Sequence, residues 1–300
     1  MKVITAEIEE TKAISIGEKL SAYLELSKPR IAFMLVLTAA AGFYLGTAQG
    51  FDVTLFVNMT IGITLLAFGV ATLNQVWERK SDALMERTAS RPLPTNKVTL
   101  TEALVFGISL CLVSEIYLAV LVNVLTAVLG LVVIVGYVLL YTPLKSRTSA
   151  STAIGAIPGA LPPLMGFTAA ANEITLGAWT LFAILFLWQF PHFLAIAWMY
   201  KEQYAKAGIK MLPVIEPSGK ITARQIVIFT ILLLPVSLAP YFLGMAGLIY
   251  LIGASLLGLW FLAASIKAAR AKSVEQARKL LLVSVIYLPL LFALMVFNHI

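Results

Sequence analysis

Long apolar stretches alternate with short polar connections along almost the whole chain. Nine stretches contain roughly the 20 residues that a helix needs to cross the hydrocarbon core of a bilayer. We expect transmembrane helices at residues 31–49, 53–78, 99–122, 124–142, 150–171, 177–200, 222–243, 246–266 and 280–298. The pattern predicts an all-α, polytopic membrane protein, in which a polar segment at 1–28 precedes a single transmembrane domain at 29–300.

Composition and charge add an orientation to this picture. Hydrophobic residues make up 60% of the chain and charged residues 12%, with a mean hydropathy of +0.93, whereas soluble domains carry about 25% charged residues. The 22 Lys and Arg residues lie in the N-terminal segment and in every second connection. Because cytoplasmic connections are enriched in these residues, we expect a cytoplasmic N terminus and an external C terminus. The net charge of +7 is then a topology signal and does not indicate a nucleic-acid partner.

The first 28 residues mix Lys and Glu, and they contain neither an apolar signal core nor the Arg-rich, acid-poor pattern of a transit peptide. This favours a bacterial or archaeal plasma membrane, and we expect a multi-pass protein of the bacterial plasma (inner) membrane.

Polar residues at the end of the second expected helix outline a cation site. Asn74, Glu78 and Asp82 follow at i, i+4 and i+8, so a helix places them on one face. Mg²⁺ binds oxygen ligands, commonly one or two carboxylates together with phosphate oxygens. The alternative is a solvated helix end that pairs with Arg79 and Lys80.

Two further polar segments are expected on the same side of the membrane. The connection 141–148 carries Lys145 and Arg147, which could neutralise a diphosphate or could only be topology signals. The helix expected at 177–200 contains His192, an ionisable group inside an apolar span. Such residues tend to face a cavity, although a neighbouring helix could also satisfy the imidazole. Glu202 follows this helix and could complete a second metal position.

Several separated strings together resemble one known family. They are SKPR at 27–30, N-xxx-E-xxx-D followed by LMERTASRPLP, YTPLKSRT with GAIPGALPPLMGF, and FLWQFPHF with YAKAGIKMLPV. They are similar to the UbiA-type intramembrane prenyltransferases, and the later strings resemble the branch that modifies haem. The resemblance covers nearly the whole chain.

This resemblance implies nine transmembrane helices around a central cavity, active-site loops on the cytoplasmic side, and Mg²⁺ as cofactor. It also implies transfer of farnesyl from farnesyl diphosphate to a vinyl group of haem B, giving haem O. Besides these substrates and the bilayer, candidate partners are haem A synthase and terminal oxidase assembly proteins. By motif, the catalytic residues would be Asn74, Glu78, Asp82 and Lys145, the metal ligands Asn74, Glu78, Asp82 and Glu202, the diphosphate contacts Arg87, Arg91, Lys145, Arg147 and Lys206, and the haem-side residues His192 and Gln189.

The chain departs from the family pattern where that pattern commonly reads D-R-D-x-D. Here residues 78–82 are ERKSD, and Gln203 stands where a second acid is expected. These changes leave fewer carboxylates for a second Mg²⁺. Two other functions stay open at this point: a related enzyme that prenylates a quinone precursor, and a cation or substrate transporter. A transporter would tend to place its ionisable residues near the bilayer midplane, whereas here they collect at one rim.

Overall fold

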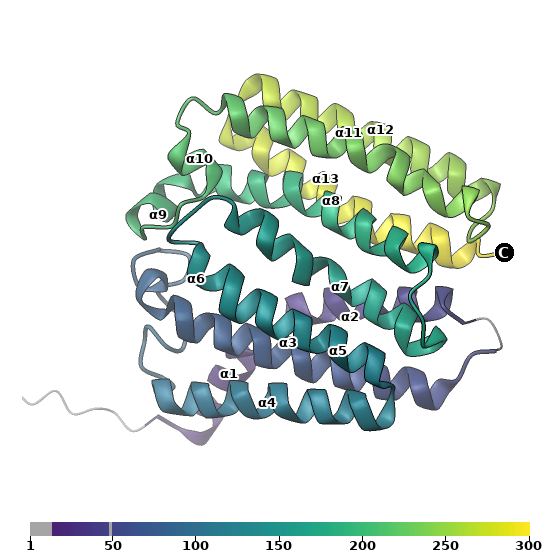
Figure 1. Cartoon of the computed structure of the whole chain (residues 1–300). Coiled ribbons are helices and arrows are strands. Elements are labelled where there is room, and N and C mark those ends of the chain that lie inside the picture. The colour runs from purple at the N-terminus through teal and green to yellow at the C-terminus, as the bar shows by residue number, and fades with distance from the viewer. Residues whose placement is uncertain (1–13, 48–49) are drawn as a thin grey trace, which may run out of the picture.

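The computed structural model describes residues 14–47 and 50–300, and every regular element in these ranges is helical (Figure 1). The elements are α1 (Ile16–Leu26), α2 (Pro29–Leu45), α3 (Val53–Asp82), α4 (Leu100–Leu121), α5 (Val124–Ile134), the π-helix η1 (Val135–Tyr141), α6 (Thr142–Leu144), α7 (Ser151–Ala171), α8 (Leu176–Met199), α9 (Lys201–Lys206), α10 (Leu212–Ile215), α11 (Lys220–Phe242), α12 (Leu248–Ala271) and α13 (Val274–Phe297).

The membrane spans expected from hydropathy are confirmed within these ranges. Eight helical stretches are long and apolar enough to cross a bilayer, with α5, η1 and α6 forming one continuous stretch, Val124–Leu144. Helices α1 and α2, which bend by 44° at their junction, pass the same test as a pair and would make a ninth span.

Some boundaries differ from the expected ones. Helix α1 lies inside the segment expected to be only polar, and Ser15 and Glu18 start it with a reciprocal capping box. Helix α2 ends at Leu45, before the expected 49, while residues 48 and 49 lie outside the described ranges. Helix α13 begins at Val274 because the Ser273 side chain caps it, six residues before the apolar run that predicted it.

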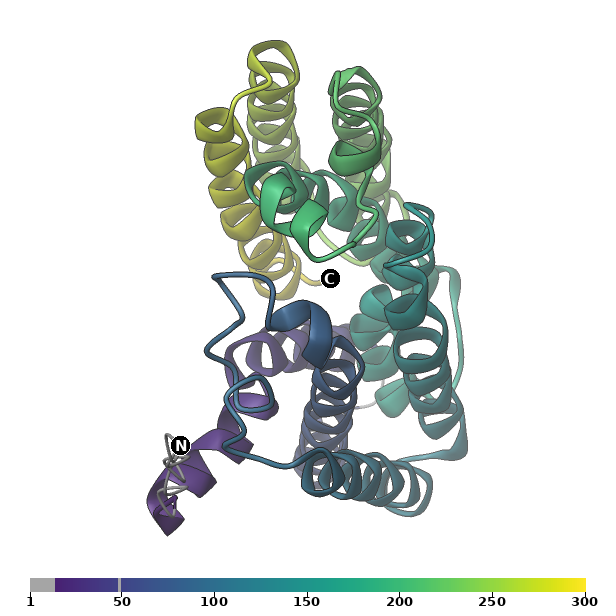
Figure 2. The same ribbon diagram turned by 90° about the vertical axis from the view of Figure 1, so that its left-hand side faces the viewer.

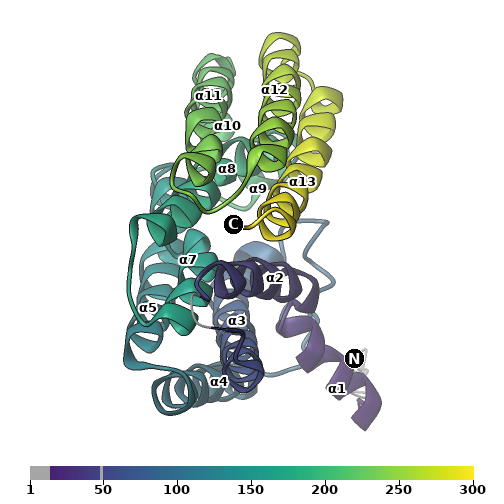
Figure 3. The ribbon, with the colours of Figure 1, turned by 90° about the vertical axis from the view of Figure 1, so that its right-hand side faces the viewer.

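The helices form two groups that are visible when the bundle is viewed from either end (Figures 2 and 3). One group contains α2 to α5, and the other contains α8 and α11 to α13. Helix α7 packs against α2, α5 and α8, and 72% of its span is buried, more than any other span in the described ranges. The two groups therefore meet around α7.

Two glycines allow α2 and α7 to approach at backbone distance. A Cβ on Gly166 of α7 would lie 1.8 Å from the Ala39 carbonyl oxygen, and a Cβ on Gly42 of α2 would lie 2.0 Å from the Pro163 carbonyl oxygen. Small residues permit such close contacts between membrane helices. The close packing of α2 on α7 therefore depends on these two glycines.

The end of the α5–η1–α6 stretch is wound as a π-helix. At its end the Tyr137 carbonyl oxygen accepts the backbone N–H of Thr142, five residues on, and also the Thr142 hydroxyl at 2.7 Å. Pro143, which follows, has no N–H to donate. π-Turns are rare and occur often at functional sites. This one turns Tyr137 and Tyr141 toward each other, with ring centroids 4.9 Å apart.

Candidate functional site

The predicted polar face of α3 lies at the end of the bundle that also carries α6, α9 and α10, opposite the C terminus (Figure 1). Asn74, Glu78 and Asp82 occupy the last three turns of α3, as their spacing predicts. Asn74 and Asp82 are buried and Glu78 is half-buried. Each of the three contacts a lysine or arginine from outside α3. We call these residues and their partners, Lys28, Lys145 and Arg91, the charged rim.

Asp82 pairs with Arg91 of the α3–α4 connection. The Arg91 Nη1 lies 2.7 Å from Asp82 Oδ2, and the Asp82 side chain is only 1% exposed. The second carboxylate oxygen, Oδ1, is buried and has no hydrogen-bond partner within the described part of the chain. A buried carboxylate oxygen without a partner is costly, so this atom is free for an added cation or donor.

Glu78 pairs with Lys145, which follows α6. The Lys145 Nζ lies 2.5 Å from Glu78 Oε1 and 4.4 Å from the centroid of the Tyr141 ring. Burial disfavours the charged ammonium, but Glu78 and the neighbouring tyrosines outweigh this and hold the pKa of Lys145 well above its usual range. Lys145 is therefore a fixed positive charge at physiological pH.

Lys28 is a member of the charged rim that the sequence analysis did not single out. Its Nζ donates to Asn74 Oδ1 at 2.8 Å, and Asn74 Nδ2 donates to Thr142 Oγ1 at 3.2 Å. The backbone of Lys28 is left-handed, with φ of 49°, at the bend between α1 and α2. The signal for Lys28 in the sequence is its place beside Pro29 at the start of an apolar span, where a lysine also fits as a topology charge.

The alternative interpretation of this α3 end is wrong, because Glu78 and Asp82 do not pair with their neighbours Arg79 and Lys80. Arg79 donates to the Val76 carbonyl oxygen, and Lys80 is exposed.

Arg87 extends the rim toward α8 and α9. Its guanidinium carbon lies 4.9 Å from the Tyr200 ring centroid and 5.8 Å from that of Tyr204, and Nη2 donates to Tyr204 Oη at 3.3 Å. Gln203, at the position expected to be acidic, accepts from the Arg87 backbone N–H. Aromatic faces hold this guanidinium without neutralising it.

The remaining predicted residues of this end are not gathered into the rim. Arg147, Glu202 and Lys206 are exposed, and their side chains make no hydrogen bond or ion pair in the described ranges. Nor do three His, Cys, Asp or Glu side chains of residues 14–47 and 50–300 converge as a metal-binding group. Two carboxylates and an amide, one carboxylate oxygen being unpartnered, fit a single Mg²⁺ that takes its other ligands from phosphate and water. The role of Glu202 stays a prediction.

His192 and Gln189 of α8 contact different helices. His192 Nδ1 lies 2.8 Å from the Ser284 hydroxyl on α13. Gln189 is buried and donates to the Ala156 carbonyl oxygen of α7 at 3.0 Å, where Gly159 leaves room for its side chain. A neighbouring helix thus satisfies part of each residue, and their haem-side roles stay predictions.

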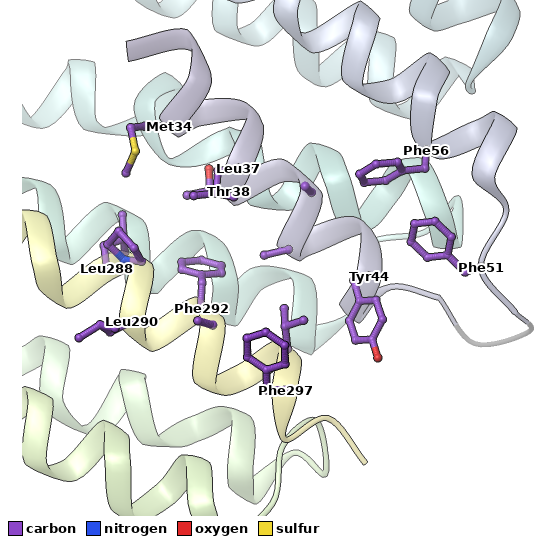
Figure 4. A pocket seen from close by; sticks show the side chains of 15 residues that line it. Met34, Leu37, Thr38, Tyr44, Phe51, Phe56, Leu288, Leu290, Phe292 and Phe297 are labelled. Atoms are coloured by element: carbon purple, nitrogen blue, oxygen red, sulfur yellow. The ribbon is translucent and has the colours of Figure 1, made fainter. Parts of the chain in front are cut away.

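An apolar cavity of about 530 Å³ lies between α2 and α13 (Figure 4). This volume is within the usual range for small-molecule sites. We call it the apolar groove; its lining runs along α2 from Met34 to Tyr44 and along α13 from Leu288 to Phe297, and Phe51 and Phe56 approach its far end. Met34 is six residues beyond Lys28, about 9 Å along a helix. The groove therefore begins close to the charged rim, and Thr38 is one of the few polar residues in it.

Comparison with known proteins agrees with the resemblance in the sequence. The model of the UbiA prenyltransferase family matches residues 35–296. Protoheme IX farnesyltransferase of Solibacter usitatus is 48% identical over 286 residues, which cover 92% of this chain and 98% of that protein. Protoheme IX farnesyltransferase of Koribacter versatilis is 44% identical over 295 residues, which cover 95% of each.

Solved structures with the same fold are more distant in sequence. A digeranylgeranylglyceryl phosphate synthase structure superposes with a TM-score of 0.77 at 19% identity, covering 94% of this chain and 98% of that one. A UbiA homologue from Archaeoglobus fulgidus, bound to GPP and Mg²⁺, gives a TM-score of 0.65 at 17% identity, covering 91% and 99%. These likenesses show the arrangement of the helices.

Proposed function

This chain belongs to the UbiA prenyltransferase family, and we propose that it transfers farnesyl from farnesyl diphosphate to a vinyl group of haem B, giving haem O and diphosphate. The relatives named protoheme IX farnesyltransferase support this acceptor over a quinone precursor. The structural observation that carries the proposal is the charged rim at one end of α2 and the apolar groove further along the same helix. A prenyl diphosphate has the same two parts.

We propose that the charged rim binds the diphosphate. Arg87 and Lys145 already hold their charges against aromatic rings, and Arg91 can share its guanidinium fork between Asp82 and a phosphate oxygen. Exposed Arg147 and Lys206 could contact the diphosphate from the α6 and α9 side. Neutralising the leaving group lowers the cost of breaking the C1–O bond of an allylic diphosphate.

Mg²⁺ would be held by Asp82, Glu78 and Asn74. When bound, it would supply Lewis-acid neutralisation of the departing diphosphate. Binding requires the lysine partners of Glu78 and Asn74 to turn toward the phosphate, which their long side chains allow.

The apolar groove would bind the farnesyl chain and keep water from it. Burial of fifteen carbons would supply on the order of 10 kcal/mol of gross transfer energy at about 0.8 kcal/mol per CH₂. That binding energy would fix C1 at the end of the groove that is nearest the rim.

The charge pattern supports placing the rim at the cytoplasmic face of a bacterial plasma membrane, with the C terminus outside. We propose haem A synthase or terminal oxidase assembly proteins as candidate partners in the same membrane.

The direct test incubates the purified protein with haem B, farnesyl diphosphate and Mg²⁺, with EDTA as control. Mass spectrometry should find a product heavier than haem B by one farnesyl group and one hydroxyl group, and only in the sample without EDTA. Consumption of the diphosphate only with a different acceptor would overturn haem as the substrate. A diphosphate that is never consumed would overturn prenyl transfer itself.

A further inference from the structure

The contact between His192 and Ser284 has a direction that its distances determine. The Ser284 hydroxyl lies 2.6 Å from the Leu281 carbonyl oxygen, to which it donates its single hydrogen. A carbonyl oxygen can only accept, so the Ser284 oxygen is left as an acceptor. Nδ1 of His192, 2.8 Å away, must then be the donor. In the neutral imidazole, Nδ1 is then the protonated nitrogen, and Nε2 carries a lone pair.

Two further contacts hold this imidazole in place. The Trp188 ring stacks on it with centroids 4.5 Å apart and planes 24° apart. The same indole donates its N–H to the backbone carbonyl oxygen of Ser284 at 2.8 Å. One residue of α13 thus orients two side chains of α8, and Ser284 itself is fully buried.

The lone pair of Nε2 is not used within the protein. Nε2 makes no hydrogen bond to any residue of the described ranges. It is also not one of the fully buried polar atoms there that lack a partner, so it is accessible. His192 is half-buried, so part of its side chain is accessible. No Asp, Glu, Lys or Arg side chain hydrogen-bonds to the ring there. It is a neutral base with one free acceptor position.

Along the bundle axis, His192 lies at a level between the charged rim and the apolar groove. His192 is seven residues before the end of α8 at the rim side, about 10 Å along the helix. Ser284 is one turn before Leu288, and both share a face of α13 that continues into the apolar groove. The reacting carbon of a prenyl diphosphate joins the diphosphate to the chain, so it belongs at this level.

We propose that His192 accepts, at Nε2, a proton from the water that becomes the new hydroxyl, and that Ser284 is the positioning residue that keeps Nε2 unprotonated. This rests on the proposed function. The outer vinyl carbon bonds to C1 of farnesyl as the C1–O bond breaks, and that bond's electron pair leaves with diphosphate. The other vinyl carbon becomes cationic and takes an electron pair from water oxygen. One water proton moves to Nε2, giving an imidazolium that the Trp188 face stabilises.

The tautomer is tested on the wild-type protein by NMR with ¹⁵N-histidine. The chain has two histidines, and Nδ1 of the other, His299, lies 2.7 Å from the Met245 carbonyl oxygen and must also be a donor. His299 is thus an internal reference, assigned with His299→Asn. We expect both rings to show the Nδ1–H pattern, with His192 losing it in Ser284→Ala. A proton on Nε2 of His192 in the wild type overturns the proposal, whether or not the protein farnesylates haem.

The chemistry is tested by the ratio of two products. Without this base, the carbocation at the former inner vinyl carbon instead loses a proton to solvent, which gives a product that lacks the elements of water. We expect Ser284→Ala to lower kcat at least about tenfold and to raise the share of this anhydro product, with KM for farnesyl diphosphate within about twofold. Ser284→Thr, which restores the hydroxyl, should recover the hydrated product.

A matched control is Ser265→Ala, which removes another fully buried serine hydroxyl that is bonded to Thr230. It should leave the product ratio unchanged. Equal loss of both products in Ser284→Ala, or an unchanged ratio, would reduce Ser284 to a packing residue and overturn the proposal.

Discussion

Helix α2 takes part in two regions with opposite chemistry. At its start, Lys28 belongs to the charged rim, where an amide and two carboxylates each contact a cation. From Met34 onward it lines the apolar groove with α13. The rim can bind charge and the groove can bind only hydrocarbon. The contrast implies that recognition of the diphosphate and of the tail are separate properties of the site, joined by the position of one helix.

The change expected to break the rim most completely is Asp82→Asn. It keeps the volume but removes the charge that binds Arg91 and the oxygen that is free for Mg²⁺. We expect turnover to fall at least about 100-fold for prenyl diphosphates of every tail length, measured as diphosphate release. Glu275→Gln is a matched control at an exposed pair with Lys279, and it should have no effect. Activity retained by Asp82→Asn in an intact, helical protein would refute its role.

Lys28→Met tests whether the start of α2 belongs to the rim. Loss of its ammonium leaves Asn74 Oδ1 without a donor and removes one positive charge. We expect KM for farnesyl diphosphate to rise by about tenfold, with the same factor for geranyl diphosphate, in steady-state kinetics. Arg30→Met, at an exposed position two residues away, is the control. An effect that depended on tail length would place Lys28 in the groove instead.

Ala293→Trp tests the groove alone. Ala293 lines it from α13, so a large side chain there should shorten it without touching the rim. We expect the preference for farnesyl over geranyl diphosphate to fall by about tenfold, measured by competition and mass spectrometry, because fewer CH₂ groups are buried. Ala119→Trp, on the exposed side of α4, should leave this preference as it was. If both substrates lose equally, the groove is not where the tail lies.

Gly166→Ala tests the close contact between α2 and α7, which sets the position of the helix shared by the rim and the groove. Its new Cβ would lie 1.8 Å from the Ala39 carbonyl oxygen, so α2 and α7 must separate. We expect a destabilisation of about 1–3 kcal/mol, seen as a lower Tm in detergent, together with a modest loss of activity for all substrates. Gly17→Ala, where a Cβ meets nothing within 4 Å, should be neutral or slightly stabilising. An unchanged Tm in Gly166→Ala would show that α2 has room to shift.

The spans and the polar face of α3 could be predicted because they depend on local periodicity. Hydropathy fixes where a helix crosses the bilayer, and a spacing of four residues fixes which side chains share a face. The partners of that face could not be predicted in the same way. Lys28 and Lys145 approach α3 only after several helices have packed, and Arg91 reaches it through a turn of the following connection. The charge pattern that marks topology conceals all three.

The contacts within the membrane were harder still to foresee. A buried serine in an apolar span is usually a packing residue, and Ser284 lies 92 residues from His192. The π-helix contains a hydrogen bond from the Thr142 N–H to the Tyr137 carbonyl oxygen, five residues back, which no hydropathy period reports. Helix α1, in contrast, has a local signal in the sequence, the Ser15 and Glu18 capping box, which predicts a helix start.

The position of Arg87 against two tyrosine rings has a kinetic consequence. A guanidinium paired with a carboxylate contributes little to the potential outside the protein, whereas one held by aromatic faces keeps its full charge. Together with the exposed Arg147 and Lys206, it gives this end of the bundle a standing positive field. An anionic substrate arriving from the aqueous side is therefore steered before it makes any contact, and added salt should slow its capture.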